Sequence, residues 1–247
     1  VRLSKFHTGI GGDGVILIGP SNVADAQMRI FNLDGSEGKM CGNGIRCVGK
    51  YLFDSGRVKR DTITVDTLSG IKTLRLAICG GKARAVTVDM GPAALSPQAI
   101  PVKLPGERAV DVPLAVGDQS WAITCVSMGN PHAVVFIDHV DSFPLEQVGP
   151  RFERHPLFPE GVNTEFVQVI DSHTLKMRVW ERGSGETLAC GTGACATAVA
   201  AVLNGFCAKD EDITVKLRGG DLTIRYTDET VWMTGPAETV FTGEVDV

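Results

Sequence analysis

The sequence predicts an α+β (mixed α/β) protein made of two similar halves related by a pseudo-twofold axis. Three observations lead to this prediction: many short strand-like runs, only a few long helices, and an internal repeat within the 247 residues. Short apolar runs between glycine and proline turns are typical of strands, and a repeat of this kind is typical of a duplicated unit. Each half is therefore expected to contain several strands and one long helix.

Strands make up most of the predicted elements. Helices are expected over Gly44–Asp54, Leu145–Arg154 and Thr192–Asn204. The strands are expected, in chain order, over Val15–Ile18, Gln27–Phe31, Thr62–Asp66, Thr73–Ile78, Ala85–Asp89, Trp121–Val126, Ala133–Ile137, Thr164–Ile170, Leu175–Trp180, Ile213–Leu217, Leu222–Tyr226 and Val231–Thr234.

The helix over Thr192–Asn204 is unusual because its stretch Ala194–Leu203 carries no charged residue on any face. A helix that is apolar all round is normally buried all round. In a chain this rich in strands, we expect a sheet to wrap this helix.

The repeat aligns Arg29–Gly44 with Arg178–Gly193, 149 residues later, and both copies end in Cys-Gly-x-Gly. Each copy contains a strand, a glycine-containing loop, a cysteine, a helix and further strands. We expect one half to comprise residues 1–90 with 236–247, and the other residues 91–235. The match continues with Leu68–Gly70 against Leu217–Gly219, and ends with Met90–Ala93 against Thr234–Ala237.

Composition narrows the function classes. The net charge is −5, and no cluster of Lys and Arg stands out, which argues against a nucleic-acid or anionic-membrane partner. No apolar run approaches the roughly 18 residues that a membrane span needs. Seven cysteines in a chain of this length indicate reduced thiols and a cytoplasmic location.

Cys41 and Cys190 each lie at the expected start of a helix. Unpaired backbone N–H groups and the helix dipole favour negative charge there, so we expect a lowered thiol pKa. The amides of Gly42-Asn43 and of Gly191-Thr192 can hold a carboxylate. One thiol on each side of a bound carboxylate suits racemisation or epimerisation at the α carbon, with the helix dipoles stabilising the developing charge.

Other interpretations of the cysteines were weighed. Spacings of six residues from Cys41 and five from Cys190 to the next cysteine do not fit a zinc ribbon. A structural disulfide is disfavoured in a reducing compartment, although oxidation could join the two thiols and inactivate an enzyme. The glycine-rich segment Gly9–Gly14 is interpreted as a tight turn. The remaining cysteines are expected to be buried packing residues: Cys47, Cys79, Cys125, Cys195 and Cys207.

The motifs resemble those of the diaminopimelate epimerases. Phe31–Glu37 with Met40–Cys47 is similar to the first signature of that family, and Glu181–Ala194 to the second. Gly129–His132 and Gly161–Glu165 follow its pattern in the same order. The resemblance implies two halves, each a curved, mostly antiparallel sheet around a central helix. It also implies an isomerase that needs no cofactor, neither pyridoxal phosphate nor a metal.

The implied reaction converts LL-2,6-diaminopimelate into the meso form, in lysine and peptidoglycan biosynthesis. By resemblance Cys41 and Cys190 form the acid/base pair, and Glu181 and His132 belong to the catalytic set. The expected substrate-binding residues are Asn32, Gly42, Asn43, Asn130, Asn163, Glu181, Arg182, Gly191 and Thr192.

One departure from the family pattern concerns the start of the chain. The family begins with a strand, a helix and a substrate-contacting Asn motif that this sequence lacks, and position 14 is glycine. We expect low or no activity and an exposed sheet edge in the first half as a result.

Two other functions are left open. One is a racemase or epimerase of the proline or hydroxyproline type, and the other is an inactive carboxylate-binding module. Asn32, Asn163 and Arg182 disfavour the first, because proline has no distal zwitterion to bind. A small-molecule substrate is expected, and a homodimer is left open.

Overall fold

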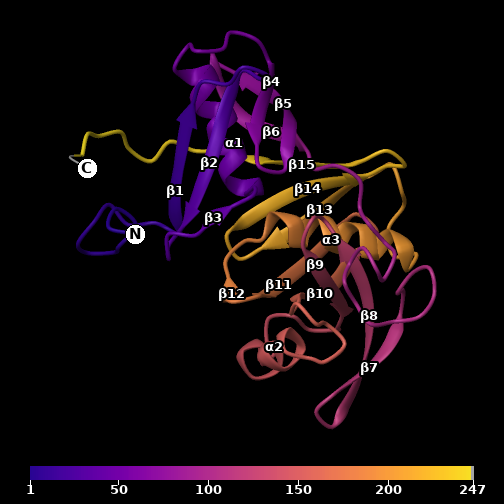
Figure 1. Ribbon diagram of the computed structural model, residues 1–247. Helices are drawn as coiled ribbons and strands as arrows, with labels where there is room; N and C mark the ends of the chain where they lie inside the picture. The colour runs from indigo at the N-terminus through magenta and orange to yellow at the C-terminus, as the bar shows by residue number, and fades with distance from the viewer. Residues whose placement is uncertain (246–247) are drawn as a thin grey trace. The chain divides into compact units, whose positions relative to one another are not determined.

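The computed structural model describes residues 1–245 and forms two compact units. One unit comprises Val1–Asp89 and the chain from Thr234 onward, and the other comprises Met90–Met233. The described residues contain fifteen strands and three helices, so the predicted α+β class is confirmed (Figure 1). No helix in this part of the chain is long and apolar enough to span a membrane.

The first unit is a sheet with one helix against it. Its strands lie in the order β1-β2-β4-β5-β6, and neighbours are antiparallel except for β2 and β4, which are parallel. The elements are β1 (Gly14–Gly19), β2 (Ala26–Asn32), β3 (Glu37–Gly38), α1 (Gly42–Asp54), β4 (Thr62–Thr67), β5 (Gly70–Cys79) and β6 (Lys82–Asp89).

Helix α1 packs against β5 and β6 through its apolar face. Ile45, Val48 and Leu52 recur at helical spacing and are buried, whereas Tyr51 on the other face is exposed. Gly49 lies so close to Leu74 that a Cβ there would come within 2.9 Å of its methyl group. This close approach fixes the helix on the sheet.

The second unit is a larger sheet in the order β7-β8-β9-β10-β11-β13-β14, with parallel pairs at β9/β10 and β11/β13. The short strand β12 pairs with β11. The elements are β7 (Val112–Val116), β8 (Gln119–Ser127), β9 (Pro131–Phe136), α2 (Leu145–Glu153), β10 (Asn163–Asp171), β11 (Thr174–Glu181), β12 (Gly185–Thr187), α3 (Gly191–Leu203), β13 (Asp212–Leu217) and β14 (Gly220–Tyr226). The last strand, β15 (Val231–Pro236), begins in this unit, and its residues from Thr234 onward belong to the first unit.

Helix α3 contacts β8, β9, β10, β11, β13 and β14, so the expectation that a sheet wraps this helix is confirmed. Every residue from Gly193 to Ala201 is buried. Its small side chains let the surrounding strands approach closely on all sides. A second core lies on the other side of the sheet, where Trp121, Phe152 and Phe166 pack edge to face.

The repeat is visible in the strand registers of the two units. In the first unit Phe31 of β2 pairs with Glu37 of β3. In the second unit the residues 149 positions later, Trp180 of β11 and Glu186 of β12, pair in the same way. Arg29 and Glu37 form a bidentate ion pair with a 2.8 Å Nε–Oε1 distance. The ion pair of Arg178 and Glu186 has the same geometry, and it is more deeply buried.

Beyond the helices the predicted alignment is wrong by one residue. The turn after β4 pairs Thr67 with Gly70, and the turn after β13 pairs Leu217 with Gly220, so the separation there is 150 residues. The second copy has one more residue between its helix and the next strand. Identical leucine and glycine letters had favoured the other register.

All twelve predicted strands and all three predicted helices are present, with ends shifted by a few residues. The short strands β3, β7 and β12 were not predicted. Two cysteine predictions are wrong, because Cys47 and Cys79 are exposed: Cys47 lies on the outer face of α1, and Cys79 ends β5 at a hairpin. Cys125, Cys195 and Cys207 are buried as expected.

Candidate active site

Cys41 is the N-cap residue of α1, as expected. Its backbone is extended (φ −136°, ψ 117°), and its Sγ accepts a hydrogen bond from the Gly44 N–H at 3.4 Å. The thiol is half-buried. A sulfur at this position lies at the positive end of the helix dipole.

The other predicted site residues of the first unit lie beside this helix start or at the end of β2. The Oδ1 of Asn43 accepts a hydrogen bond at 3.1 Å from Arg46, whose guanidinium also donates to the Gly42 carbonyl. Asn32 is exposed and donates through Nδ2 to the Ser36 hydroxyl at 3.0 Å. The first turn of α1 is thus braced by a buried arginine one turn further on.

Cys190 is the N-cap residue of α3 and has a similar backbone (φ −121°, ψ 109°). Its surroundings differ from those of Cys41, because Cys190 is buried and its Sγ lies 3.5 Å from the Thr192 hydroxyl. Burial raises the pKa of the Cys190 thiol well above its ordinary value, and the nearby carboxylates of Glu181 and Glu165 raise it further. The Thr192 hydroxyl and the Gly193 N–H lower it by less.

For Cys190, the expected fall in thiol pKa is therefore wrong. The helix N-terminus was correctly predicted, but burial, Glu181 and Glu165 raise the pKa of the Cys190 thiol by more than the hydrogen bonds of Thr192 and Gly193 lower it. The burial of the thiol and the two acidic neighbours depend on the tertiary structure, which the local motif did not reveal.

A group of polar residues meets where β11 ends. The Arg182 N–H donates to Asn163 Oδ1 at 2.9 Å, and Asn163 Nδ2 donates to the Pro131 carbonyl at 3.0 Å. Glu181 accepts a hydrogen bond from the Thr187 hydroxyl. The exposed Arg182 side chain donates to the Glu160 carbonyl at 2.7 Å. Asn163, at the start of β10, is therefore hydrogen-bonded both to the start of β9 and to the residue that follows β11.

His132 and Asn130 connect the parallel strands β9 and β10 to the helix start. His132 is fully buried, and its Nδ1 lies 2.7 Å from Glu165 Oε1. Its Nε2 lies 3.0 Å from Asn130 Oδ1, and Asn130 Nδ2 donates to the Thr192 hydroxyl at 3.2 Å. The predicted residues Asn130, His132, Thr192 and Cys190 thus form one connected network.

Glu165 is the residue of this network that the sequence analysis did not select. Its signal was present, because side chains two positions apart on a strand share a face, and Asn163 was already selected. A carboxylate directly before the apolar pair Phe166-Val167 of β10 is a second signal, since such groups are seldom fully buried without a partner.

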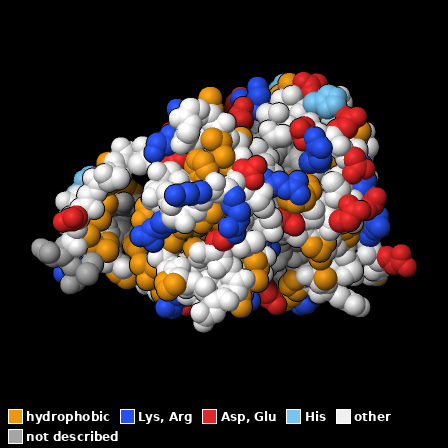
Figure 2. All heavy atoms as spheres, turned by 90° about the horizontal axis from the view of Figure 1, so that it is seen from above, with side chains coloured by type: hydrophobic (Ala, Val, Ile, Leu, Met, Phe, Trp, Pro, Cys, Tyr) orange, Lys and Arg blue, Asp and Glu red, His pale blue; other side chains and the backbone are white. Residues whose placement is uncertain are grey.

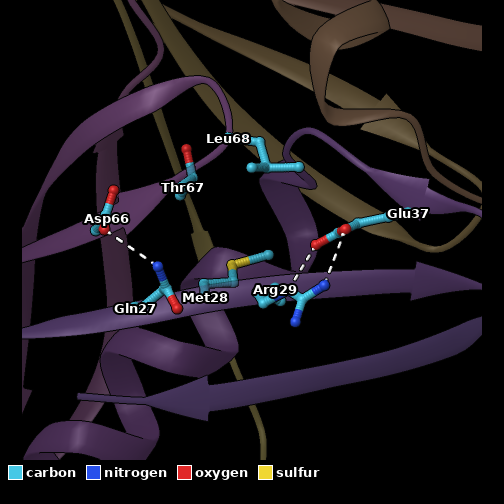
Figure 3. Close-up of a pocket in the computed structure, with 7 residues that line it drawn as sticks. All are labelled: Gln27, Met28, Arg29, Glu37, Asp66, Thr67 and Leu68. Atoms are coloured by element: carbon cyan, nitrogen blue, oxygen red, sulfur yellow. Dashed lines mark hydrogen bonds and ion pairs between the residues drawn. The ribbon is translucent and has the colours of Figure 1, made fainter. Parts of the chain in front are cut away.

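Other candidate sites were searched in the described part of the chain. It contains no group of three or more His, Cys, Asp or Glu that could hold a metal ion, and no disulfide. A pocket of about 370 Å³ in the first unit contains none of the predicted site residues (Figure 3). Among its charged residues, Arg29 and Glu37 are paired with each other, and Asp66 accepts a hydrogen bond from Gln27. Acidic and basic side chains both occur on the face shown in Figure 2.

Comparison with solved structures identifies the class of fold. A probable proline racemase from Agrobacterium radiobacter has a TM-score of 0.75 at 18% identity, covering 100% of this chain and 80% of that one. A hydroxyproline epimerase from Agrobacterium vitis has a TM-score of 0.71 at 17% identity, covering 95% and 75%. The chain therefore has the fold found in these amino-acid racemases and epimerases.

Sequence comparison identifies the family. Residues 2–96 and 124–240 match the family model described as Diaminopimelate epimerase. The diaminopimelate epimerase of Acetivibrio thermocellus is 56% identical, covering 100% of this chain and 88% of that protein. That of Geobacillus kaustophilus is 54% identical, covering 98% and 84%. The chain belongs to the diaminopimelate epimerase family.

Proposed function

We propose that this protein epimerises LL-2,6-diaminopimelate to the meso form, with Cys41 and Cys190 as the acid/base pair. The observation that carries the proposal is that each half of the repeat places a cysteine at the N-cap of its helix. Membership of the diaminopimelate epimerase family supports the choice of substrate. The low identity to the racemase and epimerase structures supports no more than a shared fold.

The chemistry needs one base and one acid. One cysteine, as thiolate, takes the α proton from one face of the carbon, and the other, as thiol, gives a proton to the opposite face. The C–H electron pair stays on the α carbon and spreads onto the carboxylate oxygens until the new C–H bond forms. The reverse reaction exchanges the two roles. This mechanism requires both thiols to reach the same carbon of the substrate.

The two helix starts supply the stabilisation of the intermediate. The N–H groups of Gly42 and Asn43, and those of Gly191 and Thr192, lie in the first turn of their helices, where the helix dipole carries positive partial charge. Bound to the substrate carboxylate, they stabilise the charge that develops on its oxygens.

The environment of Cys190 supports its role as the initial proton donor. A buried thiol whose pKa is raised stays protonated at neutral pH. Cys41 is less buried, and its Sγ accepts a hydrogen bond from the Gly44 N–H. With Cys190 as the proton donor, Cys41 takes the role of the base in that direction of the reaction.

The remaining polar residues would bind the two ends of the substrate. The Glu181 carboxylate would bind the ammonium group at the reacting centre. Asn32, Asn130, Asn163 and the Arg182 guanidinium would hold the distal amino-acid end. In this assignment the reaction uses a small-molecule substrate in the cytoplasm and needs no cofactor or metal. Specificity then lies in the distal anchors, because a polar substrate group left unpaired costs about 1–3 kcal/mol.

The test is direct conversion of substrate by the reduced protein. LL-diaminopimelate is added, and the LL and meso forms are separated by chiral chromatography over time. L-proline and trans-4-hydroxy-L-proline are assayed in parallel. The proposal expects conversion of diaminopimelate alone. Conversion of the cyclic amino acids would favour the racemase alternative, and turnover of none would contradict an enzymatic role for this chain.

A further inference from the structure

Glu165 lies fully buried in the second unit and is only partly satisfied. Its Oε1 contacts His132, but its Oε2 has no hydrogen-bond partner among the described residues. Burying a carboxylate is unfavourable, and leaving one of its oxygens without a donor adds to the penalty. A residue that weakens the fold in this way is a candidate for a role in function.

The contacts of Glu165 lead to Cys190. His132 lies 2.7 Å from the carboxylate, Asn130 lies 3.0 Å from His132, and Thr192 lies 3.2 Å from Asn130. The Thr192 hydroxyl then lies 3.5 Å from the Cys190 Sγ. All five residues belong to the second unit. Four consecutive contacts therefore join a buried carboxylate to the thiol.

The directions of these hydrogen bonds are consistent along the network. Asn130 Nδ2 donates to the Thr192 hydroxyl oxygen, so the hydroxyl proton of Thr192 can point at Cys190 Sγ. Asn130 Oδ1 is then the acceptor that faces His132 Nε2, while the Glu165 carboxylate is the acceptor that faces Nδ1. Both ring nitrogens thus face acceptors, so both hydrogen bonds form when each nitrogen carries a proton, and together they hold the ring in one orientation.

Glu165 also lies directly beneath the cysteine turn. A Cβ on Gly193 would come within 2.6 Å of Glu165 Oε1 and within 3.2 Å of Cys190 Sγ. The equivalent residue in the first unit, 149 positions earlier, is Ile16, which lies beneath Gly44 in the same way. The carboxylate is therefore specific to the Cys190 side of the repeat.

We propose that Glu165 is a positioning residue for the epimerisation: it holds His132 in place, and through Asn130 and Thr192 it aims the Thr192 hydroxyl at Cys190. This inference rests on the proposed function. After Cys190 gives its proton to the substrate carbon, the hydroxyl donates a hydrogen bond to the new thiolate. Glu165 is not assigned a contact with the substrate, and its positioning effect passes through His132, in addition to the direct action of its charge on the Cys190 thiol.

The test is a double-mutant cycle of Glu165→Gln and His132→Asn, read as kcat and KM for diaminopimelate. Gln keeps the shape of the side chain and removes its charge. We expect Glu165→Gln to lower kcat by about tenfold or more and to leave KM within about twofold. In the His132→Asn background the same change should lower kcat much less, because the contacts that carry the positioning effect to Cys190 are already broken. Glu211→Gln, which alters an exposed Glu–His pair with His173, is the matched control and keeps the native rate.

Two results would overturn the inference while the native chain remains active. One is an unchanged kcat in Glu165→Gln, and the other is a loss that multiplies in the His132→Asn background. If Glu165→Gln does not fold, the inference is tested instead by the ¹⁵N NMR signals of the His132 ring in the native protein. These signals are assigned by their loss in His132→Asn. A proton held on Nδ1 supports the inference, and an Nδ1 without a proton contradicts it. If the native chain has no activity, the proposed function fails instead.

Discussion

Ile16 and Glu165 occupy equivalent positions on β1 and β10, each beneath the second glycine of a Cys-Gly-x-Gly turn. The duplicated framework is therefore alike in backbone but different in chemistry. The side chain beneath the Cys41 turn is apolar, whereas the one beneath the Cys190 turn is a buried carboxylate in contact with a histidine. This replaced side chain is one cause of the different environments of the two thiols, beside the deeper burial of Cys190 and its neighbour Glu181.

The raised pKa of Cys190 predicts its reactivity. A thiol whose pKa is raised stays protonated at neutral pH and ionises only in more alkaline solution, so iodoacetamide should label it slowly at neutral pH and faster as pH rises. Glu181→Gln removes a charge that raises this pKa, so labelling should reach the same rate at lower pH. Mass spectrometry of the Cys190 peptide measures this, with Cys125, whose pKa is raised to about 12 by burial, as the unlabelled reference. An unshifted profile in Glu181→Gln would contradict the assigned cause.

Gly193→Ala and Gly44→Ala test whether Glu165, beneath the Cys190 turn, and Ile16, beneath the Cys41 turn, support the two cysteines differently. At Gly193 the new methyl group meets the Glu165 carboxylate and the Cys190 sulfur, neither of which can move without breaking the network. At Gly44 it meets the flexible end of Ile16. We expect Gly193→Ala to lower kcat by about a hundredfold, the cost of a misplaced reacting group, and Gly44→Ala to cost less. Equal losses in steady-state assays would show that the two supports are equivalent.

Equivalent positions on helices α1 and α3 should differ in whether they tolerate a larger side chain. Ala196 on α3 is fully buried within its sheet, whereas Cys47, 149 residues earlier on α1, is exposed. Ala196→Leu should lower the free energy of unfolding by about 1–3 kcal/mol through overpacking. Cys47→Leu should change it by less than about 0.5 kcal/mol. Urea denaturation followed by circular dichroism measures both, and a tolerated Ala196→Leu would show that the strands around α3 can separate.

Much of the fold was accessible from the sequence because it depends on local patterns. Alternating apolar residues predicted the strands, and the uncharged stretch of α3 predicted its burial. The repeated Cys-Gly-x-Gly motif predicted both helix starts. The short strands β3 and β12 were missed because their two or three residues show no periodicity, and they exist through pairing with β2 and β11.

The chemistry of the site was less accessible, because it depends on burial and on contacts between distant segments. The pKa of Cys190 is set by desolvation and by Glu181 and Glu165, which a helix-start argument ignores. Glu165 meets His132 only because β9 and β10 pair in parallel, with His132 opposite Asn163. The parallel register places the carboxylate one step along the same face, and no local motif encodes that register.

The most direct test of the two-cysteine mechanism is α-proton exchange in D₂O, followed by ¹H NMR of diaminopimelate. The reduced native protein is compared with Cys41→Ala and Cys190→Ala. The mechanism predicts that the native protein replaces the α proton with deuterium as it interconverts the LL and meso forms, and that either substitution lowers this interconversion by about a thousandfold or more. Interconversion at the native rate in either variant would contradict a pair of cysteines acting as acid and base.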